Sequence, residues 1–293
     1  MTLDLSALTP VLRHNYLQYA VAPRPVCFAS TIDRNGRINL SPFSFFNMFS
    51  STPPVLIFSP SRRVRDNTTK HTLDNVLAVP EVVINIVDYD MVHQVSLASC
   101  EYPKEINEFV KAGFTEMPAT RVRPPMVKES KIKIECKVLE VKPLGNEGGA
   151  GNLVICEALC MHIDDAILDD EKKMIDQRRI RHIARLGGDW YCRVDEHNLF
   201  QVEKPNTQLG IGIDSLPAPI RNSAILSGND LGQLANVHEM PVIDPAFYDD
   251  TLKNIFQYYS VNPEEMEKEL HTYAKKLLQQ GKVTEAWQVL LAL

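Results

Sequence analysis

A run of small polar and aromatic side chains, NLSPFSFF, occupies residues 39–46. It follows a strand-like segment that contains Ser30 and Thr31, so two neighbouring strands would bring several hydroxyl groups and an amide together. Pro42 lacks a backbone N–H and disturbs strand pairing, which leaves nearby N–H groups free to face a ligand. These groups can hold a flat ring with polar edges. The alternative is an ordinary hairpin with a polar outer face and an aromatic core plug.

A second segment, SPSRRVRDNTTK at residues 59–70, mixes four cations with hydroxyl side chains. It lies between a predicted strand and a predicted helix at 66–77, and the first N–H groups of a helix have no partner within it. Cations, hydroxyls and a helix N-terminus together suit a phosphate monoester dianion. The alternative is a solvated cationic turn.

A third cluster, HIARLGGDWY, occupies residues 182–191. Its Arg185, its glycine pair and its two aromatic side chains can cover a stacked ring. The alternative is a helix that ends at Gly187 and Gly188 and keeps its aromatic side chains in the core.

The sequence offers little for a metal ion or for a dedicated dinucleotide-binding domain. Its eight histidines include no His-x-x-x-His pair, so we predict no metal site. The glycines at 210 and 212 lack the third glycine and the following helix of a Rossmann fingerprint. The six cysteines include no Cys-x-x-Cys pair, and we expect reduced thiols.

The composition is that of a globular protein, with 44% of the 293 residues hydrophobic and 23% charged. A formal net charge of −6 argues against general affinity for nucleic acid. No apolar run reaches the roughly 18 residues of a transmembrane helix, and the first ten residues lack the base and the apolar run of a signal peptide. We therefore expect a cytoplasmic protein that binds neither nucleic acid nor membrane.

Short β-rich segments dominate residues 25–165. The segments 25–31 and 37–42 flank Asn35-Gly36, a strong β-hairpin signal. Further strands are predicted at 55–59, 82–87, 132–141 and 153–163, and helices at 66–77 and 105–112. This pattern predicts a mainly β fold, a mostly antiparallel barrel with inserted helices.

The character of the sequence changes after residue 204, which predicts two regions, 1–204 and 205–293. Residues 209–236 are rich in Gly, Pro, Ser and Asn, as in an extended segment. Asn262-Pro263 with Glu265 marks the start of a helix that Gly281 ends, and 282–293 forms another. We expect this C-terminal extension to wrap the first region. An independent partner-binding module is the alternative.

Several short motifs follow one another between residues 20 and 195. They are Arg24-Pro25-Val26, Ser30-Thr31, Gly36, Asn39, Ser41-Pro42-Phe43-Ser44, Pro53-Pro54, Ser59, Arg65-Asp66, Thr68, Asn85, Glu129-Ser130, Glu135-Cys136, Arg185, Gly187-Gly188 and Tyr191. Their order and spacing resemble the flavin reductase-like, FMN-binding split-barrel proteins, which include those called flavoredoxin. The resemblance implies a split β-barrel and a non-covalently bound FMN.

The resemblance also implies where the FMN lies. Its isoalloxazine would follow residues 39–45, and its phosphate would meet side chains of the basic segment 59–69. The implied cofactor-binding residues are Arg24, Asn39, Ser41, Pro42, Phe43, Ser44, Phe45, Ser59, Ser61, Arg62, Arg65, Asp66, Thr68, Thr69, Asn85 and Arg185. No catalytic residue is predicted.

The implied activity is hydride transfer from NADH or NADPH to the flavin, and onward transfer to a small-molecule, flavin or protein acceptor. A flavoredoxin-like electron carrier or sensor without its own NAD(P)H turnover shares the same binding residues and is the alternative. A pyridoxine-phosphate-type oxidase on a similar barrel is a third. We also expect a homodimer, because the side chains of Phe43, Phe45, Phe46 and Phe49 would otherwise expose an apolar patch.

Overall fold

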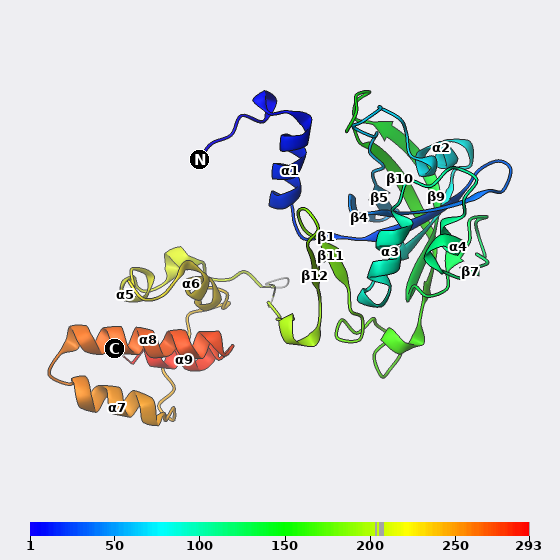
Figure 1. The fold of residues 1–293 in the computed structure, drawn as a ribbon. Helices are drawn as coiled ribbons and strands as arrows, with labels where there is room; N and C mark the ends of the chain where they lie inside the picture. The colour runs from blue at the N-terminus through cyan, green and yellow to red at the C-terminus, as the bar shows by residue number, and fades with distance from the viewer. Residues whose placement is uncertain (203, 205–207, 293) are drawn as a thin grey trace. The chain divides into compact units, whose positions relative to one another are not determined.

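The computed structural model describes residues 1–202, 204 and 208–292. The chain divides into two compact units, residues 1–200 and 201–293, which are described separately (Figure 1). The predicted boundary lies between residues 204 and 205, and residue 205 is outside the described residues. Within the described part of the chain, no helix has both the length and the apolar character needed to cross a membrane.

The main sheet of the first unit has seven antiparallel strands in the order β3-β2-β6-β9-β10-β5-β4. Their bounds are β2 Cys27–Ile32, β3 Ile38–Phe43, β4 Phe46–Ser51, β5 Pro54–Phe58, β6 Glu81–Ile86, β9 Ile132–Pro143 and β10 Asn152–Ile163. β3 and β4 are the outermost strands, yet only Ser44 and Phe45 separate them in sequence. The sheet must therefore curl until its edges meet, which gives the predicted split barrel.

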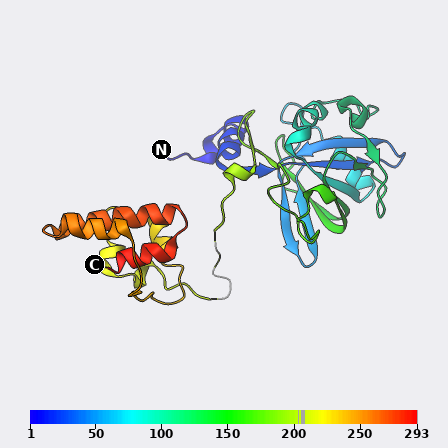
Figure 2. The ribbon, with the colours of Figure 1, turned by 90° about the horizontal axis from the view of Figure 1, so that it is seen from below.

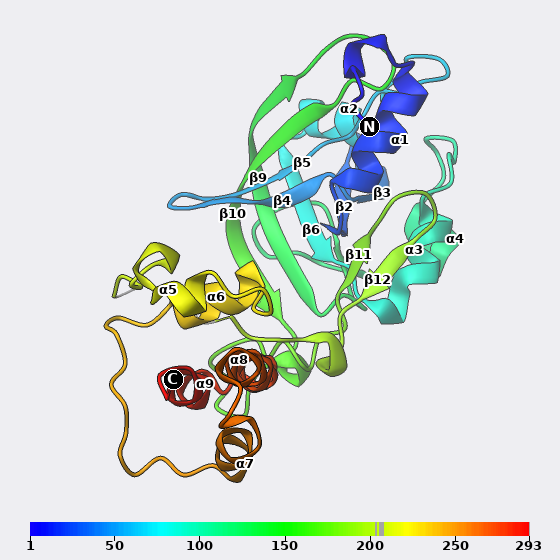
Figure 3. The same ribbon diagram turned by 90° about the vertical axis from the view of Figure 1, so that its left-hand side faces the viewer.

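The strands predicted from the sequence are confirmed. In the hairpin, Cys27 of β2 pairs with Phe43 of β3, and Ile32 pairs with Ile38. Gly36 in its turn has a φ of +80°, which glycine adopts without steric cost. The four segments predicted after it correspond to β5, β6, β9 and β10. β9 and β10 form a long hairpin that curves along the barrel (Figure 3).

Two apolar clusters lie on opposite faces of β2, whose six residues are all buried. Cys27 and Ala29 belong to the cluster inside the barrel, together with Phe58 and Val82. The alternate residue Phe28 belongs to the cluster under helices α3 and α4. Because successive strand residues face opposite ways, β2 needs apolar side chains at almost every position.

The remaining elements of the first unit surround this sheet (Figure 1). The helices are α1 Pro10–Ala20, α2 His71–Ala78, α3 Val92–Ala98 and α4 Glu108–Ala112. A three-stranded sheet contains β1 Arg24–Pro25, β11 Ile183–Arg185 and β12 Tyr191–Arg193, and a two-stranded sheet contains β7 Glu116–Met117 and β8 Met126–Val127.

The helix predicted at 66–77 begins later than expected, at His71. The carboxylate of Asp66 accepts a hydrogen bond from the Thr68 N–H at 3.1 Å, and Asn67 has a left-handed φ of 57°. Both features belong to a turn, which holds the chain out of a helix until Lys70. Likewise, residues 105–107 precede α4, because the Asn107 side chain caps its first turn.

The second unit is helical and has its own apolar core (Figure 2). Its helices are α5 Ala218–Arg221, α6 Gly228–Leu234, α7 Asp250–Tyr259, α8 Pro263–Gln279 and α9 Val283–Leu290. The predicted helices correspond to α8 and α9. Residues 209–236 differ from the expected extended segment, because α5 and α6 form there and contribute Ile220 and Leu234 to the core around Trp287.

Candidate functional site

A pocket opens where β3, the start of α2 and the loop after α3 meet. It includes part of the segment 39–46, for which the sequence predicted a flat ring. Its lining residues are Asn39, Ser41, Arg63, Lys70, His71, Ser99, Cys100, Glu101, Tyr102 and Glu108. Two of the predicted cofactor-binding residues, Asn39 and Ser41, are among them.

The amide of Asn39 is held in one orientation. Its Nδ2 donates to Glu108 Oε1 at 2.9 Å, and its Oδ1 accepts from the Thr72 hydroxyl at 2.7 Å. Glu108 also accepts from the Leu40 N–H at 2.9 Å and is 4% exposed. Burial raises the pKa of the Glu108 carboxyl, and the hydrogen bond from Leu40 opposes that rise. Asn39 and Glu108 thus tie β3 to α4 and α2 beneath the pocket.

The hydrogen bond from the Leu40 N–H to Glu108 also shows which N–H groups are free in the β3–β4 link, Ser44 and Phe45. The Leu40 N–H faces away from β2, so the N–H groups of Ser41 and Phe43 face β2 in a regular strand. Pro42, which points the same way as Leu40, has no N–H. The N–H groups of Ser44 and Phe45 are the first donors of this segment that have no backbone hydrogen-bond partner among the described residues.

The aromatic side chains near the link divide into two groups. Phe43 is buried against Phe58, with 5.1 Å between ring centroids, and Phe46 packs against the same core. Phe45 is 40% exposed, and Phe49 is 63% exposed. The expected patch of four phenylalanines is thus reduced to two, and an accessible ring surface beside the free N–H groups comes from Phe45.

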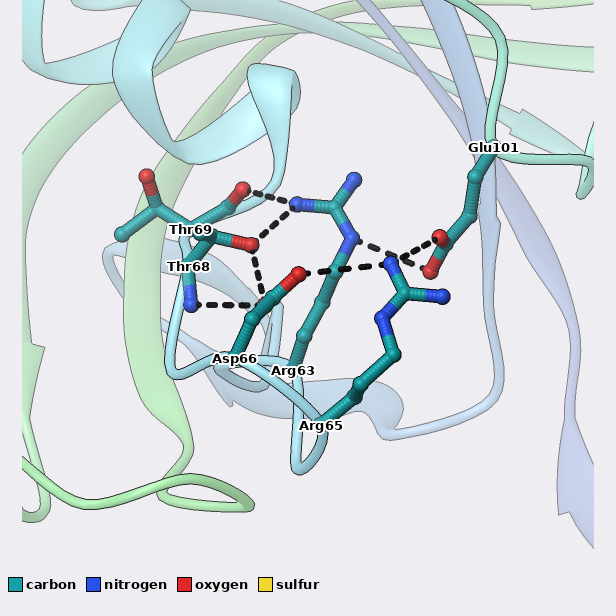
Figure 4. A network of polar contacts seen from close by, with 6 residues as sticks. All are labelled: Arg63, Arg65, Asp66, Thr68, Thr69 and Glu101. Atoms are coloured by element: carbon teal, nitrogen blue, oxygen red, sulfur yellow. Dashed lines mark hydrogen bonds and ion pairs between the residues drawn. The ribbon is translucent and has the colours of Figure 1, made fainter.

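The basic segment is folded around its own hydrogen bonds (Figure 4). Arg63 Nη1 donates to the Thr68 hydroxyl at 3.0 Å and also to the carbonyl of Thr69. The Thr68 hydroxyl in turn donates to Asp66 at 2.7 Å. Arg63 and Arg65 both reach the carboxylate of Glu101 at 3.0 Å. Two cations of the segment, Arg63 and Arg65, therefore lie toward the loop after α3.

Lys70 stands at the start of α2. Its side chain is half-buried and lies 5.2 Å above the ring of Phe43. Burial, followed by the charge of Arg63, lowers the pKa of its ammonium group. Within the described part of the chain, no carboxylate lies at ion-pair distance from Lys70, and no side chain caps the first turn of α2. An uncapped helix start beside such a cation suits a phosphate.

Two of the predicted phosphate ligands, Arg62 and Thr69, are engaged in other contacts. Arg62 donates to Asn67, and the Thr69 hydroxyl donates to Asp74 at 2.8 Å. The Ser59 N–H donates to the carbonyl of Phe45 at 2.9 Å, which joins β5 to the β3–β4 link. Ser61 is half-buried, and neither it nor Ser59 lines the pocket.

Three further predicted residues lie apart from the pocket. Asn85 is fully buried, and its amide bonds to the carbonyl of Phe28 and to the N–H of Val127. Arg24 donates to backbone carbonyls, including that of Leu186 at 2.9 Å. Arg185 donates to the carbonyl of Gly188 at 2.6 Å and lies over the ring of Tyr191. The Asn85 contacts fasten the main sheet, and those of Arg24 and Arg185 fasten the three-stranded sheet and its turn.

A second polar cluster joins β9 and β10. The buried carboxylate of Glu135 accepts from the N–H groups of Thr120 and Arg121. His162 Nε2 lies 2.6 Å from it, and Cys160 lies beside His162. Within the described residues these are the three side chains that come together as potential metal ligands. Because N–H groups already occupy the carboxylate, we assign the cluster to fastening the loop 118–123.

The sequence profile of the family described as flavin reductase like domain matches residues 19–184, more than half of the chain. The chain belongs to this family. A relative in Halalkalibacterium halodurans, uncharacterized protein BH2278, is 34% identical over 207 residues, which are 70% of this chain and 97% of the relative. An uncharacterized protein of Aquifex aeolicus is 39% identical over 173 residues, 59% of this chain and 85% of the relative.

Solved structures agree with this flavin reductase-like assignment. Nitrilotriacetate monooxygenase component B from Bacillus cereus superposes with a TM-score of 0.64 at 25% identity, covering 69% of this chain and 98% of that one. A split-barrel protein from Shewanella frigidimarina, assigned as a flavin reductase, gives 0.59 at 26% identity, covering 70% and 99%. The second unit lies beyond the family match, which ends at residue 184.

Sequence reasoning left several pocket residues out of the predicted set. Arg63 and Lys70 lie within the basic segment, and the position of Lys70 directly before a helix was the available signal. Glu101 and Glu108 come from a loop and a helix about 30 to 70 residues further along the chain than the segments they meet. No local pattern announces such a contact.

Proposed function

We propose that the chain binds FMN non-covalently and reduces it with NADH or NADPH, and that a small molecule or free flavin accepts the electrons. One observation carries the proposal: Lys70 has no carboxylate partner among the described residues, lies at the uncapped start of α2 and stands above the ring of Phe43, the last residue of β3. FMN combines a phosphate monoester with a flat ring that has polar edges. The pocket and the link suit these two parts.

Bound FMN would supply a ring that accepts a hydride and passes electrons on. Lys70, Arg63 and the first N–H groups of α2 would hold its phosphate. The N–H groups of Ser44 and Phe45 would face the ring edge that becomes negative on reduction, where fixed donors favour the reduced form. Asn39, held by Glu108 and Thr72, would keep β3 in place beneath the ring.

We further propose a homodimer. β4 is an edge strand of the sheet, and its Met48 and Phe49 are 65% and 63% exposed. The neighbouring helix α1 has no buried residue although it carries Val11, Leu12 and Tyr16. A second copy that covers these surfaces would remove both an open strand edge and exposed apolar area.

The proposal is tested by titrating the purified protein with FMN and with riboflavin, following the quenching of flavin fluorescence. We expect FMN to bind at least about tenfold more tightly than riboflavin, because one or two charge-assisted contacts to the phosphate contribute roughly 1.5 to 3 kcal/mol each. Equal affinity for the two flavins would remove the phosphate site, and a lack of binding to either would overturn the flavin proposal.

A further inference from the structure

Glu101 lies in the loop after α3. Among the described residues, its carboxylate is the one that bridges two arginines of the basic segment. Its Oε1 lies 3.0 Å from Arg63 Nε, and its Oε2 lies 3.0 Å from Arg65 Nη2 (Figure 4). Hydrogen bonds from Arg65 and Arg63 lower the pKa of Glu101, so this group is ionised at neutral pH. An anion of the protein therefore lies on Arg63, which lines the pocket, and on the exposed Arg65.

The position of this carboxylate matters because Glu101 lines the same pocket as Arg63 and Lys70. A phosphate monoester that enters the pocket meets two cations, Arg63 and Lys70, and the carboxylate of Glu101, with the buried Glu108 beside Asn39. It must either displace the Glu101 carboxylate from the guanidinium groups or bind beside it and be repelled. In both cases the affinity for a dianion is lower than the two cations alone would give.

We propose that Glu101 is a specificity-determining residue that competes with the flavin phosphate and so keeps the flavin exchangeable. This inference rests on the proposed function, since it assigns a role at the same site. A reductase that hands its flavin to an acceptor needs release of that flavin, whereas an electron carrier retains it. Glu101 thus favours a flavin that behaves as a substrate.

A purely structural role for this ion pair is the competing account. The side chains of Glu101 and Arg65 are 54% and 73% exposed and that of Arg63 is 19% exposed, and ion pairs with so exposed a carboxylate contribute little to folding. Neutralising Glu101 should therefore leave the unfolding transition nearly unchanged. Its effect on a dianion bound in the pocket should be larger, because the Glu101 carboxylate then no longer repels the phosphate.

The experiment compares Glu101→Gln with wild type and with Glu105→Gln. Glu105 is exposed, lies in the same loop, does not line the pocket and makes no ion pair with a described residue, so its variant matches the change in net charge. FMN and riboflavin affinities are measured by fluorescence quenching, and FMN dissociation is measured by stopped-flow displacement. Circular dichroism checks that each variant is folded.

We expect Glu101→Gln to tighten FMN roughly fivefold and to slow its dissociation, with riboflavin unchanged and Glu105→Gln like wild type. Added salt should reduce the difference. If wild type prefers FMN to riboflavin but Glu101→Gln leaves FMN binding unchanged or weaker, this inference is overturned and the proposed function stands. If wild type binds neither flavin, the proposed function itself fails.

Discussion

At the scale of single residues, the pocket depends on which charges are already compensated. Arg63 and Arg65 share Glu101, and Arg62 is bound to Asn67, whereas Lys70 has no ion-pair partner among the described residues. Hydroxyl groups and arginines in the basic segment predicted a phosphate site from the sequence. The sequence could not show that Thr68 and Thr69 direct their hydroxyls to Asp66 and Asp74.

We expect Lys70→Ala to weaken FMN about 10- to 100-fold and to leave riboflavin nearly unchanged, because one charge-assisted contact to phosphate contributes roughly 1.5 to 3 kcal/mol. Arg65→Ala should have a smaller effect, since Arg65 is 73% exposed and already paired with Glu101. Fluorescence titration with both flavins measures these changes. A larger loss for Arg65→Ala than for Lys70→Ala would place the phosphate on the outer side of the loop.

The carboxylate of Glu135 makes stability depend on pH. Burial opposes its ionisation, but hydrogen bonds from Thr120, His162 and Arg121 outweigh burial and lower its pKa to about 2. In the unfolded chain its pKa is near 4.3. Its contribution to the free energy of unfolding is therefore fully present above about pH 4.3 and is lost as the pH falls toward 2.

We accordingly expect Glu135→Gln to lower the free energy of unfolding by about 3 kcal/mol at pH 7, since buried N–H groups lose a charged acceptor. The difference from wild type should shrink between pH 4.3 and 2, because Glu135 of the unfolded wild type is protonated there while the folded carboxylate still has to be kept ionised. Urea denaturation at pH 7 and at pH 3 measures this. A difference that stays constant between the two pH values would show that the ionised Glu135 carboxylate is not the source of the stabilisation.

At the scale of elements, the sequence predicted those helices and hairpins whose ends are set by a local turn or cap. Asn35-Gly36 located the β2–β3 hairpin, and Asn262-Pro263 located the start of α8. β4 was missed because most of its residues are exposed, which hides the alternation of a half-buried strand. α1 was missed because none of its residues is buried. The capping box from Ser227 to Asp230 was a usable signal for α6 within a region otherwise rich in turn residues.

The β9–β10 loop braces the basic segment. The Arg62 N–H donates to the carbonyl of Ala150 at 2.8 Å, and the Gly149 N–H donates to the carbonyl of Arg62 at 3.0 Å. A Cβ at Gly148 would lie 3.0 Å from the carbonyl oxygens of Arg63 and Val64. These are backbone atoms, so a side chain at 148 must push the segment itself.

We expect Gly148→Val to weaken FMN by at least about threefold while the barrel stays folded, because overpacking of this kind costs roughly 1 to 3 kcal/mol. Gly232→Ala is the control, since a Cβ there meets no described atom within 4 Å. Flavin titration and thermal unfolding are measured for both. Unchanged FMN binding in Gly148→Val would show that the loop does not hold the arginines in place.

At the scale of the whole molecule, the chain combines a flavin reductase-like unit with a helical unit outside the family match. The second unit buries Leu270, Ala274 and Trp287 in a core of its own. A unit with its own core does not need the first one to hide its apolar side chains. This arrangement was not predictable from residues 209–236, whose composition indicated an extended wrap.

We therefore expect a protein truncated after residue 200 to remain folded, to bind FMN with an affinity within about threefold of the full chain, and to stay dimeric. Light scattering and flavin content of the purified fragment measure this. Loss of flavin from a folded fragment would show that the second unit contributes to the site.

Phe49→Lys is the matched variant for the interface and should give a monomer, because it places a charge on the exposed edge strand β4. Light scattering of the full-length variant measures this, and a wild-type protein that is itself monomeric would contradict the dimer.

We propose that this chain reduces FMN with a nicotinamide nucleotide. The most direct test is anaerobic stopped-flow mixing of the FMN-loaded protein with NADH and, separately, with NADPH, following the visible absorbance band of the oxidised flavin. We predict that at least one donor bleaches the band at a rate that rises with donor concentration and saturates. A flavin that binds but stays oxidised with both donors would contradict the claim and would favour an electron carrier or sensor without NAD(P)H turnover.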